Sequence, residues 1–195
     1  MDRTVIEGKR GFAALLADRK GQLEKPHYEA QVGAIVAALA DAFRKGNKVL
    51  WFGNGGSAAD AQHLAAEFSG RFLRERGGLP SEALTVNTSA VTAIANDFGY
   101  EQLFARMVEA LAKPGDVVVG ITTSGTSKNV VRGLERAKEV GATTVAFSGN
   151  GGGPVAEIAD LALIGPDGYS AIVQEVHIVM GHIICDLVEQ ELLFA

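Results

Sequence analysis

Short apolar runs alternate with helical segments through most of this 195-residue chain, and this alternation constrains the fold more than any other feature. Five apolar runs are expected to form strands, at 48–52, 83–86, 116–122, 143–147 and 161–164. The segments between them are expected to form helices, at 57–70, 100–112, 127–140 and 153–159. Alternating strands and helices form a parallel sheet, and strands covered on both faces are continuously apolar. The sequence therefore predicts an α/β fold with a parallel sheet and helices on both faces.

Helices are also expected on both sides of this alternating region. Residues 1–20 and 27–45 are predicted to form two leading helices, and residues 170–194 a long last helix. The last helix is apolar nearly all round, which indicates burial on most of its sides. One domain of this size rarely buries a helix so completely, so we expect this helix to pack against other subunits. We expect residues 1–195 to form a single domain, in which residues 1–45 are leading helices.

The net charge, the cysteine count and the lack of targeting or membrane segments indicate which partners and which compartment to expect. The chain has 18 Lys and Arg against 23 Asp and Glu, a net charge of −5, and no long basic run, so we expect no nucleic-acid partner. The single cysteine, Cys185, cannot form an internal disulfide, and its apolar helical surroundings favour a core position over a nucleophile. The N-terminus lacks a signal-peptide pattern and the chain lacks an uncharged apolar stretch of about 18 residues. We therefore expect a cytoplasmic protein with no membrane partner.

Polar or glycine-rich segments follow each of the first four predicted strands. These segments are 53–57, 87–89, 122–127 and 148–153. Ligands of open parallel sheets bind outside the carboxyl ends of the strands. Backbone N–H groups and hydroxyls gathered there suit an anion that carries several hydroxyls. The sequence therefore predicts a pocket for such a ligand at this edge of the sheet.

Two of these segments resemble known anion-binding motifs to different degrees. Residues 53–58 match the dinucleotide-binding pattern GxGxxA, but the second strand ends at Asn87-Thr88, where that motif needs an acidic residue. A nicotinamide-binding module is therefore the weaker hypothesis. In 122–127, hydroxyl side chains surround one glycine and Ser127 is a good N-cap for the following helix. This loop can hold a phosphate without an arginine, although an ordinary cap and turn has the same pattern.

Histidine and carboxylate side chains on the helices form the next candidate group. His63 and Glu67 are four residues apart and share one helix face, which suits a metal site, an acid/base pair or a plain surface pair. The apolar last helix carries Gln174, His177 and His182, which need polar partners. For His177 we favour a hydrogen-bonded core or interface histidine, and for the other two the choice between core and site stays open at this point.

Four segments together closely resemble the phosphoheptose isomerases, which are sugar-isomerase (SIS) domain proteins. They are 53–72, 95–104, 121–130 and 174–189, and the resemblance extends over essentially the whole chain. It implies a three-layer SIS domain with a five-stranded parallel sheet, and a homotetramer with active sites at subunit interfaces. It also implies an aldose–ketose isomerase that converts sedoheptulose 7-phosphate to D-glycero-D-manno-heptose 7-phosphate through an enediol. That reaction is the first step toward the nucleotide-linked heptose of bacterial surface glycans such as lipopolysaccharide.

The resemblance also assigns roles to particular residues. One zinc ion per subunit would be held by His63, Glu67, Gln174 and His182. We expect Glu67 to act as the base and His182 as the acid, and whether Glu67 is base or ligand at a given moment stays open. Thr122 replaces a serine that is common in the family, and the hydroxyl is kept. Substrate contacts would involve Asn54, Gly55, Gly56, Glu67, Asn96, Asp97, Thr122, Thr123, Ser124, Ser127 and Gln174.

Two questions remain open at the level of sequence. A related SIS protein is a non-catalytic adaptor that binds the replication initiator DnaA, and it lacks the residues matching Glu67 and His182. This chain has both, which favours the enzyme. Gln174 and His182 are eight residues apart, so on one helix they lie about 12 Å apart along the axis and about 80° apart around it. We therefore expect one of them to come from a neighbouring subunit, or Gln174 to lie before the helix begins.

Overall fold

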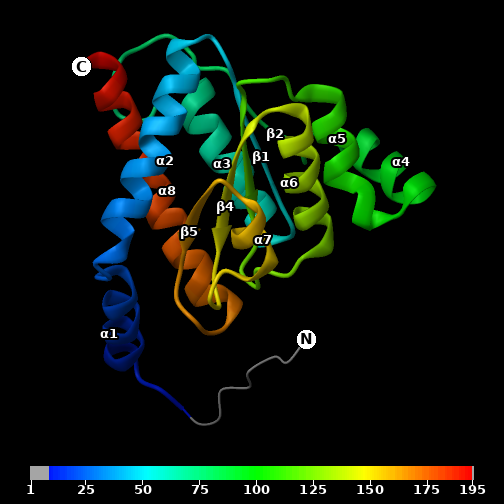
Figure 1. The fold of residues 1–195 in the computed structure, drawn as a ribbon. Helices are drawn as coiled ribbons and strands as arrows, with labels where there is room; N and C mark the ends of the chain where they lie inside the picture. The colour runs from blue at the N-terminus through cyan, green and yellow to red at the C-terminus, as the bar shows by residue number, and fades with distance from the viewer. Residues whose placement is uncertain (1–8, 195) are drawn as a thin grey trace.

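A single sheet of five parallel strands lies between two layers of helices in the computed structural model, which describes residues 9–194 (Figure 1). The strands are arranged in the spatial order β2 (Ser81–Ala83), β1 (Val49–Gly53), β3 (Val117–Ile121), β4 (Thr143–Ser148) and β5 (Leu161–Ile164). Every neighbouring pair is parallel. The predicted three-layer α/β fold with a five-stranded parallel sheet is therefore confirmed.

Each face of the sheet has its own helical layer and its own core. One layer consists of α2 (His27–Arg44), α3 (Gly56–Ser69) and α8 (Ser170–Leu193). The other consists of α4 (Thr88–Phe98), α5 (Leu103–Leu111), α6 (Lys128–Val140) and α7 (Gly153–Ile158). Side chains alternate along β1, so Trp51 packs on Phe68 of the first layer and Phe52 stacks on Phe104 of the second. Burial on both faces explains the continuous apolar runs of the sequence.

Three regions of the chain differ from the sequence-based expectation, whereas the bounds of the other elements agree to within one residue. The first helix, α1 (Phe12–Leu23), begins after extended Gly11 and ends later than expected, and residues 1–8 of the expected helix lie outside the described residues. Strand β2 extends from Ser81 to Ala83 rather than over 83–86, because the chain turns after Ala83 and Val86 donates its N–H to the Ala83 carbonyl.

The third difference concerns the segment between β2 and β3. Helix α4 was not expected, because 87–89 was interpreted as a strand-end loop. The Asn87 side chain accepts a hydrogen bond from Ala90 N at 3.0 Å and so caps this helix. The expected helix 100–112 is shorter, since a 3₁₀ turn at Tyr100–Gln102 precedes α5.

Helix α8 is buried on one side only. Among the described residues it is the one helix long and apolar enough to cross a membrane by length and composition, but half of its apolar window is buried inside the molecule. It packs along α2 and α3. Ile183 and Leu187 remain 41% and 36% exposed in the single chain, so burial on most sides would require the expected packing against other subunits and stays a prediction.

Candidate active site

A cavity of about 760 Å³ lies at the carboxyl ends of the central strands. It is lined by residues from the ends of β1, β3 and β4 and from the start of α8: Asn54, Ser57, Ile121, Thr122, Thr123, Ser124, Thr126, Ser127, Asn150, Gly168, Tyr169, Ser170 and Ala171. Three of the four polar strand ends thus contribute as predicted. The end of β2 does not, because α4 begins there instead. The cavity lining at the start of α8 was not predicted, since its polar residues precede an apolar helix and match no motif.

The hydroxyl loop 122–127 forms one wall of this cavity. Thr122 is buried, and its Oγ1 lies 2.9 Å from Ser127 Oγ and 3.3 Å from Ser124 Oγ. Ser127 is the N-cap residue of α6, but its hydroxyl faces Thr122 and makes no capping hydrogen bond. Ser127 therefore occupies the predicted N-cap position without making the expected capping hydrogen bond. The positive end of the α6 dipole and the three clustered hydroxyls thus lie at the same wall of the cavity. This arrangement suits a phosphate.

Asn54 and the two glycines after it connect β1 to α3. The Asn54 and Asn129 amides exchange two hydrogen bonds of 2.8 Å, and Tyr100 donates its hydroxyl to Asn54 Oδ1 at 2.9 Å. Gly55 has a positive φ of 57°, which favours glycine. A Cβ on Gly56 would lie 2.5 Å from Gln174 Oε1, so this position brings α3 and α8 into close contact.

Three of the predicted metal ligands meet about two to three turns after Gly56 along α3, where α8 contributes His182. Ligand atoms of His63, Glu67 and His182 all lie within 4.8 Å of one another. His63 Nε2 is 3.4 Å from Glu67 Oε1 and 2.7 Å from His182 Nε2. The ring of Phe72 stacks on the His182 ring at 5.5 Å between centroids. Ligands around a tetrahedral zinc ion lie roughly 3.3 Å from one another, so this donor set fits zinc after a small separation of the two imidazoles.

Gln174 does not join these three residues in the single chain. Its amide instead donates to Asp60 Oδ1 at 3.1 Å. Asp60 is buried, its Oδ2 has no hydrogen-bond partner, and burial raises its pKa against the lowering effects of Gln174, His63 and His182. Asp60 was missed by sequence reasoning, although it precedes His63 by three residues and so shares its helix face.

Asn96 and Asp97 lie apart from the cavity. Both are exposed on α4, where the Asn96 amide donates to Asp97 Oδ1 at 2.8 Å. Their expected contact with substrate hydroxyls therefore has no counterpart within one chain and stays a prediction.

The two remaining candidates are core residues. His177 is fully buried, and burial lowers its pKa to about 4. Its ring nitrogen Nε2 forms a hydrogen bond of 2.9 Å with the Ser148 carbonyl. Its Nδ1 has no partner, so the predicted core histidine is only half satisfied. Cys185 is buried, and burial raises the pKa of its thiol. Its predicted core position is confirmed.

Comparisons with known proteins agree with this geometry. Residues 17–149 match the SIS domain family. A phosphoheptose isomerase from Aquifex aeolicus is 55% identical over 163 residues, covering 84% of this chain and 85% of that protein. One from Geotalea daltonii is 56% identical over 162 residues, covering 83% and 84%. The structure of a phosphoheptose isomerase from Neisseria gonorrhoeae superposes with a TM-score of 0.84 at 38% identity, covering 91% of this chain and 96% of that one. The adaptor alternative finds no support among these relatives.

Proposed function

We propose that this chain, which belongs to the phosphoheptose isomerase family of SIS-domain proteins, interconverts sedoheptulose 7-phosphate and D-glycero-D-manno-heptose 7-phosphate. The observation that carries this proposal is the convergence of the Glu67 carboxylate with the His63 and His182 imidazoles, on helices next to a hydroxyl-lined cavity. In this role the chain supplies the first intermediate of nucleotide-linked heptose synthesis.

The reaction moves one proton between neighbouring carbons. Glu67 removes a proton from C1 of the ketose while His182 donates a proton to the C2 oxygen, which gives an enediol. Loss of the C1 hydroxyl proton and return of a proton to C2 then give the aldose. Glu67 Oε1 and His182 Nε2 both lie next to His63 Nε2, so a carboxylate and an imidazole are both available to the two adjacent carbons.

We further propose one zinc ion per subunit at this point. His63, Glu67 and His182 would hold it, and Gln174 is the proposed fourth ligand. A ring nitrogen bound to zinc carries no proton, so His182 would act as the acid only while it is released from the ion. When bound, zinc polarises the substrate carbonyl and stabilises developing negative charge. Because Gln174 bonds to Asp60 here, it would have to change partner or be supplied by another chain.

The phosphate and the sugar are assigned to neighbouring parts of the same edge. The loop 122–127 and the N-terminus of α6 are proposed to hold the phosphate. Asn54, Gly55 and Gly56 would contact the sugar near the start of α3. His63 follows the cavity residue Ser57 by six residues, about 9 Å along α3, so the sugar would extend along this helix from its phosphate.

A cytoplasmic homotetramer with active sites at subunit interfaces is also part of the proposal. Ile183 and Leu187 of α8 and Phe12 and Leu16 of α1 are exposed apolar residues that a second chain would cover. A neighbouring chain could also bring Asn96 and Asp97 to a cavity. Mixing inactive Glu67→Gln chains with inactive Gln174→Ala chains tests the shared site, since a site built from the Glu67 of one chain and the Gln174 of another would recover activity. No recovery in mixed oligomers verified by native mass spectrometry would show that each chain uses its own Gln174.

The direct test of function is an isomerase assay on sedoheptulose 7-phosphate. The wild-type chain is expected to form the aldose, to lose activity after treatment with a chelator and to regain it with zinc. If activity is unchanged by the chelator, and elemental analysis verifies that the metal is removed, the proposed role of zinc would be refuted. The proposed isomerase activity would stand. Absence of conversion by the zinc-loaded chain would refute the function.

A further inference from the structure

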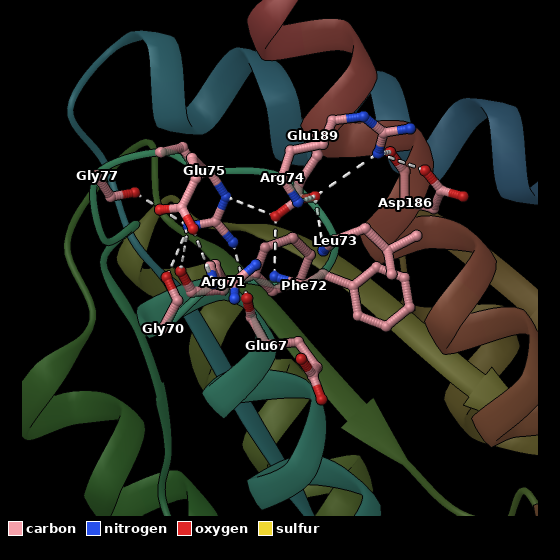
Figure 2. Close-up of polar contacts among 12 residues, drawn as sticks. Glu67, Gly70, Arg71, Phe72, Leu73, Arg74, Glu75, Gly77, Asp186 and Glu189 are labelled. Atoms are coloured by element: carbon pink, nitrogen blue, oxygen red, sulfur yellow. Dashed lines mark hydrogen bonds and ion pairs between the residues drawn. The ribbon is translucent and has the colours of Figure 1, made fainter.

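Glu189 is a buried carboxylate outside the proposed reaction centre, and its bonds join two segments of the chain. Its side chain is 0% exposed on the inner face of α8. Oε1 accepts from Phe72 N and from Arg76 Nε, each at 2.9 Å, and Oε2 accepts from Leu73 N and Arg74 N, each at 3.0 Å. Figure 2 shows Glu189 reaching from α8 to the loop that follows α3. A buried carboxylate is tolerated only when it is paired in this way.

Arg76 links this carboxylate to the end of α3. Its Nη2 donates to the Glu67 carbonyl at 2.7 Å, and its Nη1 donates to the carbonyls of Phe68 at 2.8 Å and Gly70 at 3.1 Å. The last carbonyls of a helix lack partners within the helix and carry negative partial charge, which a guanidinium satisfies. The side chain that satisfies the last turn of α3 is thus the one that pairs with Glu189 on α8.

The same contacts surround the candidate reaction centre. Glu67 lies in the turn of α3 that Arg76 caps. His182 precedes Glu189 by seven residues, so His182 and Glu189 lie on the same side of α8. Glu189 also holds the backbone of Phe72, whose ring stacks on His182. The buried pair of Arg76 and Glu189 is therefore connected to the Glu67 carboxylate through the end of α3. It is connected to the His182 imidazole through Phe72.

We propose that Arg76 and Glu189 are positioning residues that set the separation of Glu67 and His182, and with it the geometry of the site they share with His63. This rests on the proposed function of that site. Neither residue lines the cavity or belongs to the cluster of His63, Glu67 and His182. It acts through the end of α3 and through the Phe72 ring, and a lysine at position 76 would keep the charge opposite Glu189 without reaching several carbonyls at once.

The test compares Arg76→Lys and Glu189→Gln with Arg74→Lys as the matched control. Arg74 lies in the same loop, and its side chain pairs with Asp186 and, at 3.6 Å, with Glu189 on α8, but none of its hydrogen bonds reaches α3. Zinc affinity is measured by competition with a chromophoric chelator, kcat and KM by the isomerase assay, and folding by circular dichroism. Replacing outer residues of a metal site costs about 10–100-fold in metal affinity or activity. We expect losses of that size in zinc affinity and kcat for the first two variants, with KM nearly unchanged and the control near wild type.

The outcomes separate positioning from folding and from the function itself. Folded Arg76→Lys and Glu189→Gln chains with wild-type zinc affinity and kcat would overturn the proposal. Equal losses in Arg74→Lys would also overturn it, because they would indicate general loosening of the loop. A wild-type chain without isomerase activity, but with zinc affinity that falls in Arg76→Lys and not in the control, would refute the proposed function and support the positioning role.

Discussion

Gly181 of α8 lies in close contact with Leu64 of α3, and its replacement by alanine is a sharp test of how the site is held. A Cβ at this position would lie 2.7 and 2.8 Å from the two methyl carbons of Leu64. Carbon atoms in contact lie about 3.5–4.0 Å apart, so the helices or Leu64 must move by roughly 0.8 Å or more. Leu64 is fully buried and cannot turn into solvent. It follows His63 directly, and Gly181 directly precedes His182, so the movement would act on the proposed ligands.

The magnitude follows from two opposing effects on Gly181→Ala. Overpacking a core costs about 1–3 kcal/mol, and replacing a helical glycine by alanine returns about 1 kcal/mol. We therefore expect a net loss of about 0–2 kcal/mol in the free energy of unfolding. A displacement near 1 Å in an active site can cost about 100-fold in rate, so kcat is expected to fall between about 10- and 100-fold.

Gly33→Ala is the matched control for this variant. Gly33 lies within α2, and a Cβ there would meet nothing within 4 Å. This variant should gain about 0.5–1 kcal/mol from helix propensity and keep its kcat. The assay is thermal unfolding of both variants at equal protein concentration, together with steady-state kinetics. Gly181→Ala that is as stable as Gly33→Ala, with a wild-type kcat, would refute the argument that the α3–α8 contact determines the site geometry.

Three further predictions concern single groups. Glu67→Gln should abolish turnover with an unchanged circular dichroism spectrum, and near-wild-type turnover would remove Glu67 from the base role. Ser124→Ala and Ser127→Ala should each raise KM at least about tenfold, because a hydrogen bond to a charged group is worth about 1.5–3 kcal/mol; an unchanged KM would exclude this loop as the phosphate site. The pKa of His177 is about 4 in the folded chain and near 6.5 in the unfolded chain. The free energy of unfolding of the wild-type chain should therefore fall by up to about 3 kcal/mol as the pH is lowered from 6.5 to 4. His177→Gln, whose amide can still donate to the Ser148 carbonyl, should show a weaker decline in chemical denaturation, and an equal decline would assign the pH dependence to other groups.

Local patterns made part of the site predictable. Four-residue spacing on one helix places His63 and Glu67 together whatever the rest of the chain does, and the structure has them 3.4 Å apart. The alternation of strands and helices brings the polar strand ends to one edge, because parallel strands share a direction. Both inferences depend only on the geometry of single elements.

Tertiary packing determined what the sequence pattern left open. His182 is 119 residues from His63, and their contact exists only because α8 lies along α3. Asp60 shares a helix face with His63, but a carboxylate at such a position is ordinarily exposed, and only its burial and its bond to Gln174 distinguish it. Helix α4 contains several β-branched residues that lower helix propensity, and packing against the second core outweighs them.

The direction of α8 along α3 explains why Gln174 and His182 separate. Gln174 lies against Gly56 at the start of α3, Gly181 lies against Leu64 near its middle, and Glu189 lies beyond its end. The two helices therefore run in the same direction, and the spacing of about 12 Å between Gln174 and His182 is preserved along α3. The Gln174 amide meets Asp60, while His182 meets His63. A single chain thus gathers two imidazoles and a carboxylate at one point and holds the amide at another. An ion that needs all four donors therefore requires either a new conformation of Gln174 or the amide of a second chain.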